Sequence, residues 1–215
     1  MKKIAVVLSG CGVYDGAEIH ESTLTMLAIA QQGAGYQCFA PDMEQAHVVN
    51  HLTGKEMNEK RNVLVEAARI ARGDIKPLSE YKPAEYDAIV FPGGFGAAKN
   101  LCTFAFDGPD CSVNPYVEAA IRSTVKAEKP VGALCISPAV VAKVLGDVNV
   151  TIGQDKGTAE AIEKLGATHT TTTHGEIVVD EKYKLVTTPC YMLDATISQI
   201  ADGANNIVAK ILELA

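Results

Sequence analysis

The chain lacks three features that would place it at once in a large class of proteins. It has no run of basic residues and a formal net charge of −7, so it carries no electrostatic footprint for nucleic acid or an anionic membrane. No stretch of about 18 apolar residues occurs, which excludes a membrane-spanning helix. Its six cysteines include no Cys-x-x-Cys pair and resemble neither a zinc site nor a compact disulfide framework. We expect a small-molecule ligand, no metal and a reducing compartment.

The N-terminal segment is too weakly apolar for a secretory signal. Its apolar run, residues 4–8, stops at Ser9-Gly10 and no cleavage signature follows, so it predicts a first β-strand. We expect a cytoplasmic protein, or an organellar one if the source is a eukaryote. The composition, 47% hydrophobic and 21% charged, is that of an ordinary soluble domain. With no internal repeat or linker, residues 1–215 are expected to form one domain.

Short apolar runs alternate with helix-period segments along the chain, which predicts a parallel sheet covered by helices, a three-layer α/β/α sandwich. The predicted strands are residues 4–8, 37–40, 87–91, 131–135, 148–152 and 185–188. The predicted helices are residues 18–32, 58–72, 116–127, 139–145, 158–165 and 193–214. Strand-favouring residues on both sides of residues 180–182 predict an added β-hairpin. Ligands of such sheets bind beyond the carboxyl ends of the strands.

The turn after residues 131–135 predicts a reactive cysteine. Cys135 ends an apolar strand, and Pro138 suits the first position of the helix that follows. This strand-to-helix turn is a nucleophile elbow, where helix-end N–H groups lower the pKa of a thiol. The N–H of Ile136 is then placed to stabilise an oxyanion, and the N–H of Gly94, in the glycine-rich turn of residues 91–96, would complete a two-donor oxyanion hole. The alternatives are a small buried hydrophobe and a simple tight turn.

The helix predicted at residues 18–32 supplies a candidate acid. Glu21 heads a mostly apolar helix face, and burial there would raise its pKa. A partly protonated carboxyl group beside a thiolate can donate a hydrogen bond to it and later exchange a proton with substrate. Glu18, three residues after Asp15, is equally consistent with a helix cap. His20 is expected at the surface.

Three other patterns give weaker evidence for a functional site. The glycines around Gly10 resemble a dinucleotide fingerprint, but Asp15 stands where its third glycine belongs. His174 and Glu176 imitate the His-x-Glu of a cysteine triad, yet fall in the predicted hairpin. Cys190 could be a second redox thiol, with no spacing that pairs it to Cys135.

Five strings together resemble the class I glutamine-amidotransferase-like, ThiJ/PfpI superfamily, and within it the ElbB-type glyoxalases linked by name to isoprenoid biosynthesis. The strings are LSGCGVYDGAEIHE at 8–21, NHLTG at 50–54, RNVLVEAARIARG at 61–73, PGGFGAAKNL at 92–101 and LCISPA at 134–139. The resemblance covers essentially the whole chain. It implies a flavodoxin-like sandwich, a homodimer, an elbow cysteine at Cys135, an acid at Glu21, and a substrate pocket that includes Gly12, Glu18 and Asn100.

The chain departs from this superfamily where a histidine partner is expected. Peptidase-like members carry a histidine directly after the cysteine, where this chain has Ile136. Others place one near residues 153–155, and glutaminases use a His-x-Glu at the last strand-to-helix turn, where this chain has neither. A dyad of Cys135 with Glu21 remains.

The resemblance therefore implies a slow, cofactor-free, glutathione-independent glyoxalase. Cys135 would attack glyoxal or a related 2-oxoaldehyde to give a hemithioacetal, and Glu21 would move the proton that leads to glycolate. One alternative is a catalytically weak amidotransferase-like binding or redox-sensing protein with an oxidisable Cys135. Another is a glutaminase half-enzyme that uses His174 and Glu176.

Overall fold

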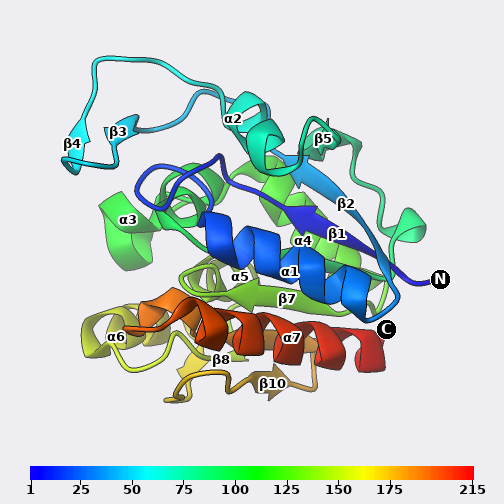
Figure 1. Ribbon diagram of the computed structural model, residues 1–215. Coiled ribbons are helices and arrows are strands. Elements are labelled where there is room, and N and C mark those ends of the chain that lie inside the picture. The colour runs from blue at the N-terminus through cyan, green and yellow to red at the C-terminus, as the bar shows by residue number, and fades with distance from the viewer.

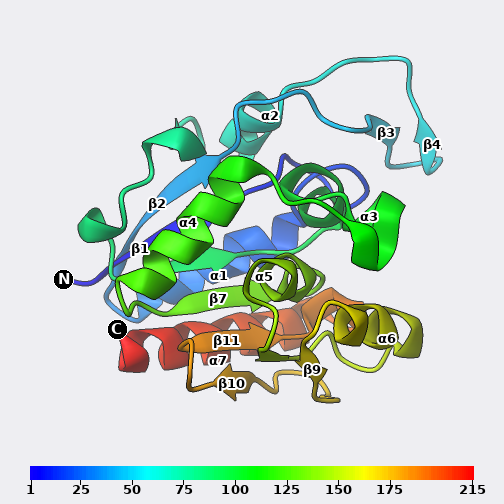
Figure 2. The same ribbon diagram turned by 180° about the vertical axis from the view of Figure 1, so that it is seen from behind.

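The structure is a computed structural model that describes residues 1–215, built on one seven-stranded sheet with helices on both faces (Figures 1 and 2). The strand order is β10-β11-β7-β6-β1-β2-β5, and every neighbouring pair is parallel except β10 with β11. The strands are β1 Lys3–Val7, β2 Gly35–Ala40, β5 Ile75–Pro77, β6 Ala88–Phe91, β7 Val131–Leu134, β10 Val178–Asp180 and β11 Leu185–Thr188. The predicted flavodoxin-like three-layer sandwich with an added hairpin is confirmed.

The central strands are apolar along their whole length because helices cover them on both sides. Every residue of β6 and β7 is buried, which explains runs that are continuous rather than alternating. Ile89 on β6 pairs with Ala5 on β1 and with Val131 on β7. The carboxyl ends of these parallel strands therefore meet at one edge of the sheet, where ligands of such folds bind.

Helices α1 and α7 pack against each other on one face, and α4 and α5 lie on the other (Figures 1 and 2). The helices are α1 Ile19–Gln31, α2 Val63–Ile70, α3 Phe104–Asp107, α4 Pro115–Lys126, α5 Pro138–Leu145, α6 Lys156–Lys164 and α7 Ile197–Leu214. Each face has its own apolar core. Ile29 of α1 and Ile207 of α7 belong to one core, and Ile121 of α4 and Val140 of α5 belong to the other. No helix is long and apolar enough to cross a bilayer.

One predicted strand lies outside the main sheet. Residues 148–152 contain only the short β8, Asn149–Val150, which pairs in parallel with β9, Thr168–His169. The antiparallel β10 already occupies that edge of the main sheet, and the N–H of Asn149 donates to the Asp180 carboxylate at 2.8 Å. The hairpin thus displaces the predicted strand into a separate two-stranded sheet.

The segment between β2 and α2 also differs from the prediction. Helix α2 starts at Val63 rather than near residue 58, because the Asn62 side chain caps it by accepting the N–H of Val65 at 3.0 Å. The preceding residues form a projecting hairpin of β3, Val49–Asn50, and β4, Lys55–Glu56 (Figure 1). Strands this short leave too little periodicity to be predicted.

Candidate active site

Cys135 occupies the predicted elbow between β7 and α5. Its φ of 60° lies in the left-handed region, which a non-glycine residue rarely adopts and which often marks a functional site. The Cys135 N–H donates to the Thr188 carbonyl at 2.9 Å, and the Ser137 hydroxyl donates to the Pro92 carbonyl at 2.8 Å. Bonds to two neighbouring strand ends therefore fix the turn, and the side chain is only 7% exposed.

Glu21, in the first turn of α1, is completely buried beside Cys135. Its carboxyl group accepts backbone N–H groups from Gly93 at 2.9 Å and Tyr191 at 3.1 Å. The Cys135 sulfur lies beside it, since a Cβ atom built at Gly93 would be 2.7 Å from Glu21 Oε2 and 2.9 Å from the sulfur. The structure thus brings together the acid and the cysteine that the sequence singled out.

Gly93 allows this contact because it has no side chain. A Cβ atom at this position would lie 2.3 Å from the Cys135 Cβ and 2.7 Å from Glu21 Oε2. Gly93 itself has no positive φ, so the requirement is for space rather than for backbone freedom. Any other residue here would separate the carboxyl group from the sulfur.

Two backbone N–H groups point at the Cys135 sulfur, those of Gly94 and Ile136. Gly94 has a φ of +94°, and a Cβ atom there would lie 2.4 Å from the Glu18 nitrogen. The two donors predicted for an oxyanion hole therefore both lie beside the sulfur, and their action on a substrate oxygen stays a prediction.

The pKa of Glu21 is raised as predicted, but the pKa of Cys135 differs from the prediction. Burial, with a smaller effect from the Glu18 charge, raises the pKa of Glu21 from 4.5 to about 8. Burial and then the Glu21 charge also raise the pKa of Cys135 well above its usual value, although the Gly94 and Ile136 N–H groups act in the opposite sense. The expected lowering of the Cys135 pKa is therefore wrong, because desolvation outweighs the helix-end donors. The resting sulfur is a thiol.

A cavity of about 330 Å³ opens onto Cys135, close to the lower size limit of small-molecule sites. It is lined by Val13, Gly94, Phe95, Cys135, Ile136, Asp155, Thr158, Tyr191 and Met192. Asp155 borders it at the start of α6 and accepts the Thr158 N–H at 2.8 Å. Hydrogen bonds from Thr158 lower the pKa of Asp155, so this helix cap is an anion at the cavity wall.

Three residues predicted to form the substrate pocket are not among those that line this cavity. The Asn100 amide donates to the carbonyls of Ser9 and Asp15 and is structural. Glu18 caps α1 by accepting the Glu21 N–H at 2.6 Å, as its alternative interpretation expected. Gly12 packs against His51 in the loop after β1, where a Cβ atom would lie 2.6 Å from the ring.

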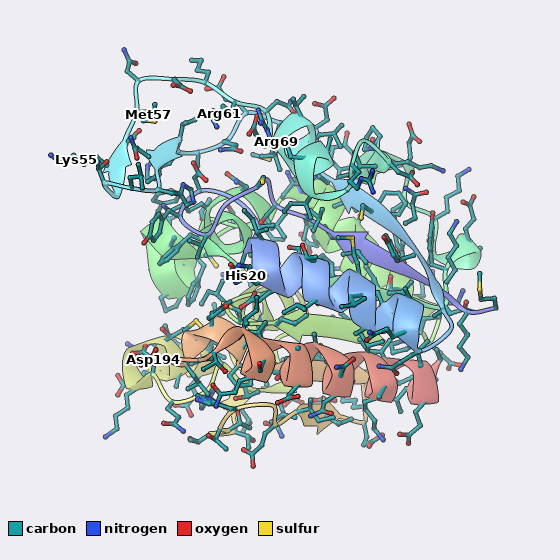
Figure 3. All side chains as sticks on the ribbon, viewed as in Figure 1. His20, Lys55, Met57, Arg61, Arg69 and Asp194 are labelled. Carbon is teal, nitrogen blue, oxygen red and sulfur yellow. The ribbon has the colours of Figure 1, made fainter.

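Sequence reasoning missed a contact between His20 and Tyr191. His20 is exposed at the start of α1, as predicted (Figure 3). Its Nδ1 atom is 2.8 Å from the hydroxyl of Tyr191, a residue that also lines the cavity. Tyr191 lies 170 positions after Glu21, whose carboxyl group accepts its N–H, so no local pattern reveals the contact.

The remaining candidates lie elsewhere. His174 and Glu176 border a different, wider groove between α7 and the segment before β10, and neither lines the Cys135 cavity. Cys190, which directly precedes Tyr191, is buried, with a φ of 42° and a pKa raised by burial. The described residues contain no cluster of side chains that could hold a metal ion.

Solved structures with the same fold define the class. The structure of an isoprenoid biosynthesis protein with an amidotransferase-like domain from Ehrlichia chaffeensis matches with a TM-score of 0.94 and 35% identity, covering 100% of this chain and 99% of that one. A glyoxalase III from Candida albicans shares the fold, with a TM-score of 0.62 at 15% identity over 97% of each chain. The fold is therefore that of an amidotransferase-like protein.

Sequence relatives narrow this class. No family model matches the chain. A human protein described as glutamine amidotransferase-like class 1 domain-containing protein 3, mitochondrial, is 49% identical over 99% of this chain and 83% of its own length. A rat protein described as ES1 protein homolog, mitochondrial, is 48% identical over 99% and 84%. The chain belongs to the family of glutamine amidotransferase-like class 1 domain proteins, as the sequence motifs predicted.

Proposed function

We propose that this protein is a glutathione-independent glyoxalase that converts glyoxal, or a related 2-oxoaldehyde, to the 2-hydroxy acid. The observation that carries the proposal is the placement of the Cys135 thiol beside a buried carboxyl group whose pKa is raised to about 8. General bases work best when their pKa lies near the working pH, and Glu21 meets that condition.

In the first step the Glu21 carboxylate accepts the thiol proton while the Cys135 sulfur attacks one aldehyde carbon. The carbonyl oxygen becomes an oxyanion, which the N–H groups of Gly94 and Ile136 stabilise. Glu21 then returns the proton to this oxygen and gives a neutral hemithioacetal. Proton removal by Glu21 replaces the preformed thiolate that the sequence suggested.

In the second step Glu21 removes the hydrogen from the hemithioacetal carbon and returns a proton to the neighbouring carbon. The enediol formed between these transfers becomes a thioester of glycolate. Water then cleaves the thioester, which releases glycolate and restores the Cys135 thiol. One carboxyl group carries the proton throughout, which accounts for a site without histidine. An aldehyde is electrophilic enough for this dyad, whereas an amide is far less reactive.

The structural likeness to a glyoxalase III supports the fold of such an enzyme, and the dyad supports the chemistry. The named human and rat relatives are mitochondrial proteins, which supports an organellar location if the source is a eukaryote. The raised pKa of Cys135 weighs against a redox sensor that relies on an ionised Cys135.

The test is acid production from a panel of aldehydes by the wild type and by Cys135→Ala. We expect wild-type glyoxal consumption with glycolate formed in equal amount, and no activity above background in the variant. Cys38→Ala is the matched control, because Cys38 is an equally buried thiol on β2 that does not line the cavity. Equal rates for the wild type and Cys135→Ala would overturn the proposal.

A further inference from the structure

A second pair of thiols lies outside the cavity, where residues 102–113 fold back on themselves. Cys102 and Val113 form an isolated antiparallel bridge. On either side of it, the N–H of Thr103 donates to the Ser112 carbonyl and the N–H of Asn114 donates to the Leu101 carbonyl, each at 2.9 Å. This pairing places Cys111 diagonally across from Cys102 on the same side of the two-stranded segment.

The two thiols are neighbours across this pairing, and both are free cysteines. Each thiol shifts the pKa of the other. Cys102 is 2% exposed and Cys111 is 3% exposed, but Cys111 lies between the exposed residues Asp110 and Ser112. Cys111 is therefore directly beneath the surface, whereas Cys102, which follows the buried Leu101, is the deeper of the two.

Charge around the pair distinguishes the two sulfurs. The Lys143 ammonium donates to the Pro109 carbonyl at 3.1 Å and so lies beside the turn that carries Cys111. The hydrogen bond from Cys102, supported by the Lys143 charge, lowers the pKa of Cys111 to about 7. The same hydrogen bond and burial raise the pKa of Cys102. Cys111 therefore ionises readily, while the neighbouring Cys102 stays protonated. This difference is typical of a reactive cysteine and of the resolving cysteine that later forms a disulfide with it.

The other buried thiols lack this arrangement. Burial raises the pKa of Cys38 to about 12 and also raises the pKa values of Cys135 and Cys190. None of these three has a neighbouring cation that lowers its pKa.

We propose that Cys111 and Cys102 form a modification site at which hydroperoxides oxidise the pair reversibly to a disulfide. The Cys111 thiolate attacks one oxygen of the peroxide, the O–O bond breaks, and sulfenic acid and hydroxide form. The Cys102 sulfur then attacks the Cys111 sulfur and displaces its hydroxyl group. Two thiols and one hydrogen peroxide thus give one disulfide and two waters. A dithiol reductant reverses the reaction.

A short π-helical turn, Ala97–Leu101, connects Cys102 to the candidate active site, because it begins three residues after Gly94 and ends directly before Cys102. The N–H of Cys102 donates to the Ala97 carbonyl at 3.3 Å, and the Cys102 thiol lies 3.5 Å from the same oxygen. The single Cys102 thiol hydrogen can be donated either to this oxygen or to the ionised Cys111 sulfur, and oxidation removes it. The modification itself needs no aldehyde, so it is independent of the proposed function.

The test uses the whole chain, treated with a small excess of hydrogen peroxide and then alkylated under denaturing conditions. We expect two fewer alkylated thiols per chain, a mass lower by two hydrogen atoms before alkylation, and a peptide that links Cys102 to Cys111. Dithiothreitol should restore both thiols. Cys111→Ser should abolish the linkage, and Cys102→Ser should leave a sulfenic acid on Cys111 that dimedone captures. Cys38→Ser is the matched control and should leave the linkage unchanged.

A second measurement needs no variant. In the native wild type, Cys111 should react with iodoacetamide at pH 7 at least about tenfold faster than Cys102, because thiolates are the reactive species. The rate should rise with a midpoint near pH 7, where Cys111 ionises. Oxidation that begins at Cys135, a linkage between two chains, or persistence of the linkage in Cys111→Ser would each overturn the proposal.

Discussion

The carboxyl group of Glu21 accepts a hydrogen bond from the backbone N–H of Tyr191, 170 residues further along the chain, at 3.1 Å. Its other oxygen accepts the N–H of Gly93 at 2.9 Å. Two backbone donors would ordinarily favour the ionised carboxylate, yet the pKa of Glu21 is raised to about 8 because burial has the larger effect. This balance determines how the protein should respond to pH and to substitution.

The first prediction concerns stability. Below pH 4.5, the ordinary pKa of this carboxyl group, Glu21 is protonated in both the folded and the unfolded chain. As the pH rises, the unfolded chain releases this proton first, so the free energy of unfolding falls until about pH 8, by up to roughly 5 kcal/mol. Glu21→Gln removes this dependence but leaves one backbone N–H without an acceptor, at a cost of about 1–3 kcal/mol.

Urea unfolding of the wild type and Glu21→Gln at several pH values measures this effect. The difference in unfolding free energy should shift in favour of the variant between pH 4.5 and about 8 and then level off. Glu176→Gln, on an exposed side chain outside the cavity, is the control and should run parallel to the wild type. Parallel curves for the wild type and Glu21→Gln would contradict a raised Glu21 pKa.

The second prediction concerns rate. Because the Glu21 carboxylate accepts the thiol proton in the proposed reaction, kcat/KM for glyoxal should increase with pH and level off above about pH 8. Glu21→Gln should lower kcat/KM by at least about 100-fold at pH 8 and above, the usual size of a general-base contribution, and the gap should narrow as the pH falls and the wild-type carboxylate is protonated. Steady-state kinetics from pH 5 to 9 checks this. A rate that falls over that range would contradict the assignment of Glu21 as the base.

The third prediction concerns Gly93. In Gly93→Ala the new Cβ would meet the Cys135 Cβ at 2.3 Å and Glu21 Oε2 at 2.7 Å, so the pair must separate. We expect a loss of activity of at least about 100-fold and a loss of stability of about 1–3 kcal/mol. Gly35→Ala on β2 is the matched control, since the nearest atom to its Cβ is the flexible end of Met1 at 3.4 Å. Activity retained in Gly93→Ala would mean that the contact is not needed.

The fourth prediction concerns Tyr191 and His20. Tyr191→Phe keeps the backbone N–H that holds Glu21 and removes only the hydroxyl that pairs with His20. Each of Tyr191→Phe and His20→Ala should therefore lower kcat/KM by less than about tenfold, as expected for one partly exposed hydrogen bond. The double variant should lose no more than either single variant, because both changes break the same bond. A loss as large as that of Cys135→Ala would instead place the hydroxyl in the chemistry.

The fifth prediction concerns the glutaminase alternative. His174 borders the groove beside α7 rather than the Cys135 cavity. His174→Ala should therefore leave glyoxal turnover unchanged, and the wild type should release no ammonia from glutamine. Ammonia release that disappears in His174→Ala would revive that alternative.

Much of the fold could be predicted because burial leaves a direct mark on the sequence. The apolar runs that became β6 and β7 are buried on both faces, and the helices beside them have clear periodicity. The strand predicted at 148–152 was misplaced because its position depends on which segment occupies the edge of the sheet. In this chain β10 occupies that edge. Edge competition is a property of the whole sheet and has no local signal.

The candidate site could be predicted in part for the same reason. Cys135 and Glu21 stand out locally, one at a strand-to-helix turn and one on an apolar helix face, and the structure brings them together. The raised pKa of Glu21 was predicted from its apolar helix face. The raised pKa of Cys135 could not be predicted, since it depends on how completely the thiol loses contact with water. Nor could the role of Tyr191, whose N–H and hydroxyl both reach α1 from the far end of the chain.

The two left-handed cysteines have a common consequence. Cys135 and Cys190 have φ values of 60° and 42°, and they follow the adjacent strands β7 and β11. At each one the next residue directs its amide inward, Ile136 toward the sulfur and Tyr191 toward the carboxyl group. Folding of the sheet therefore fixes the orientation of both amides. Binding of a ligand at this site would then need no further ordering of the backbone, because the dipoles of the two amides are already in place.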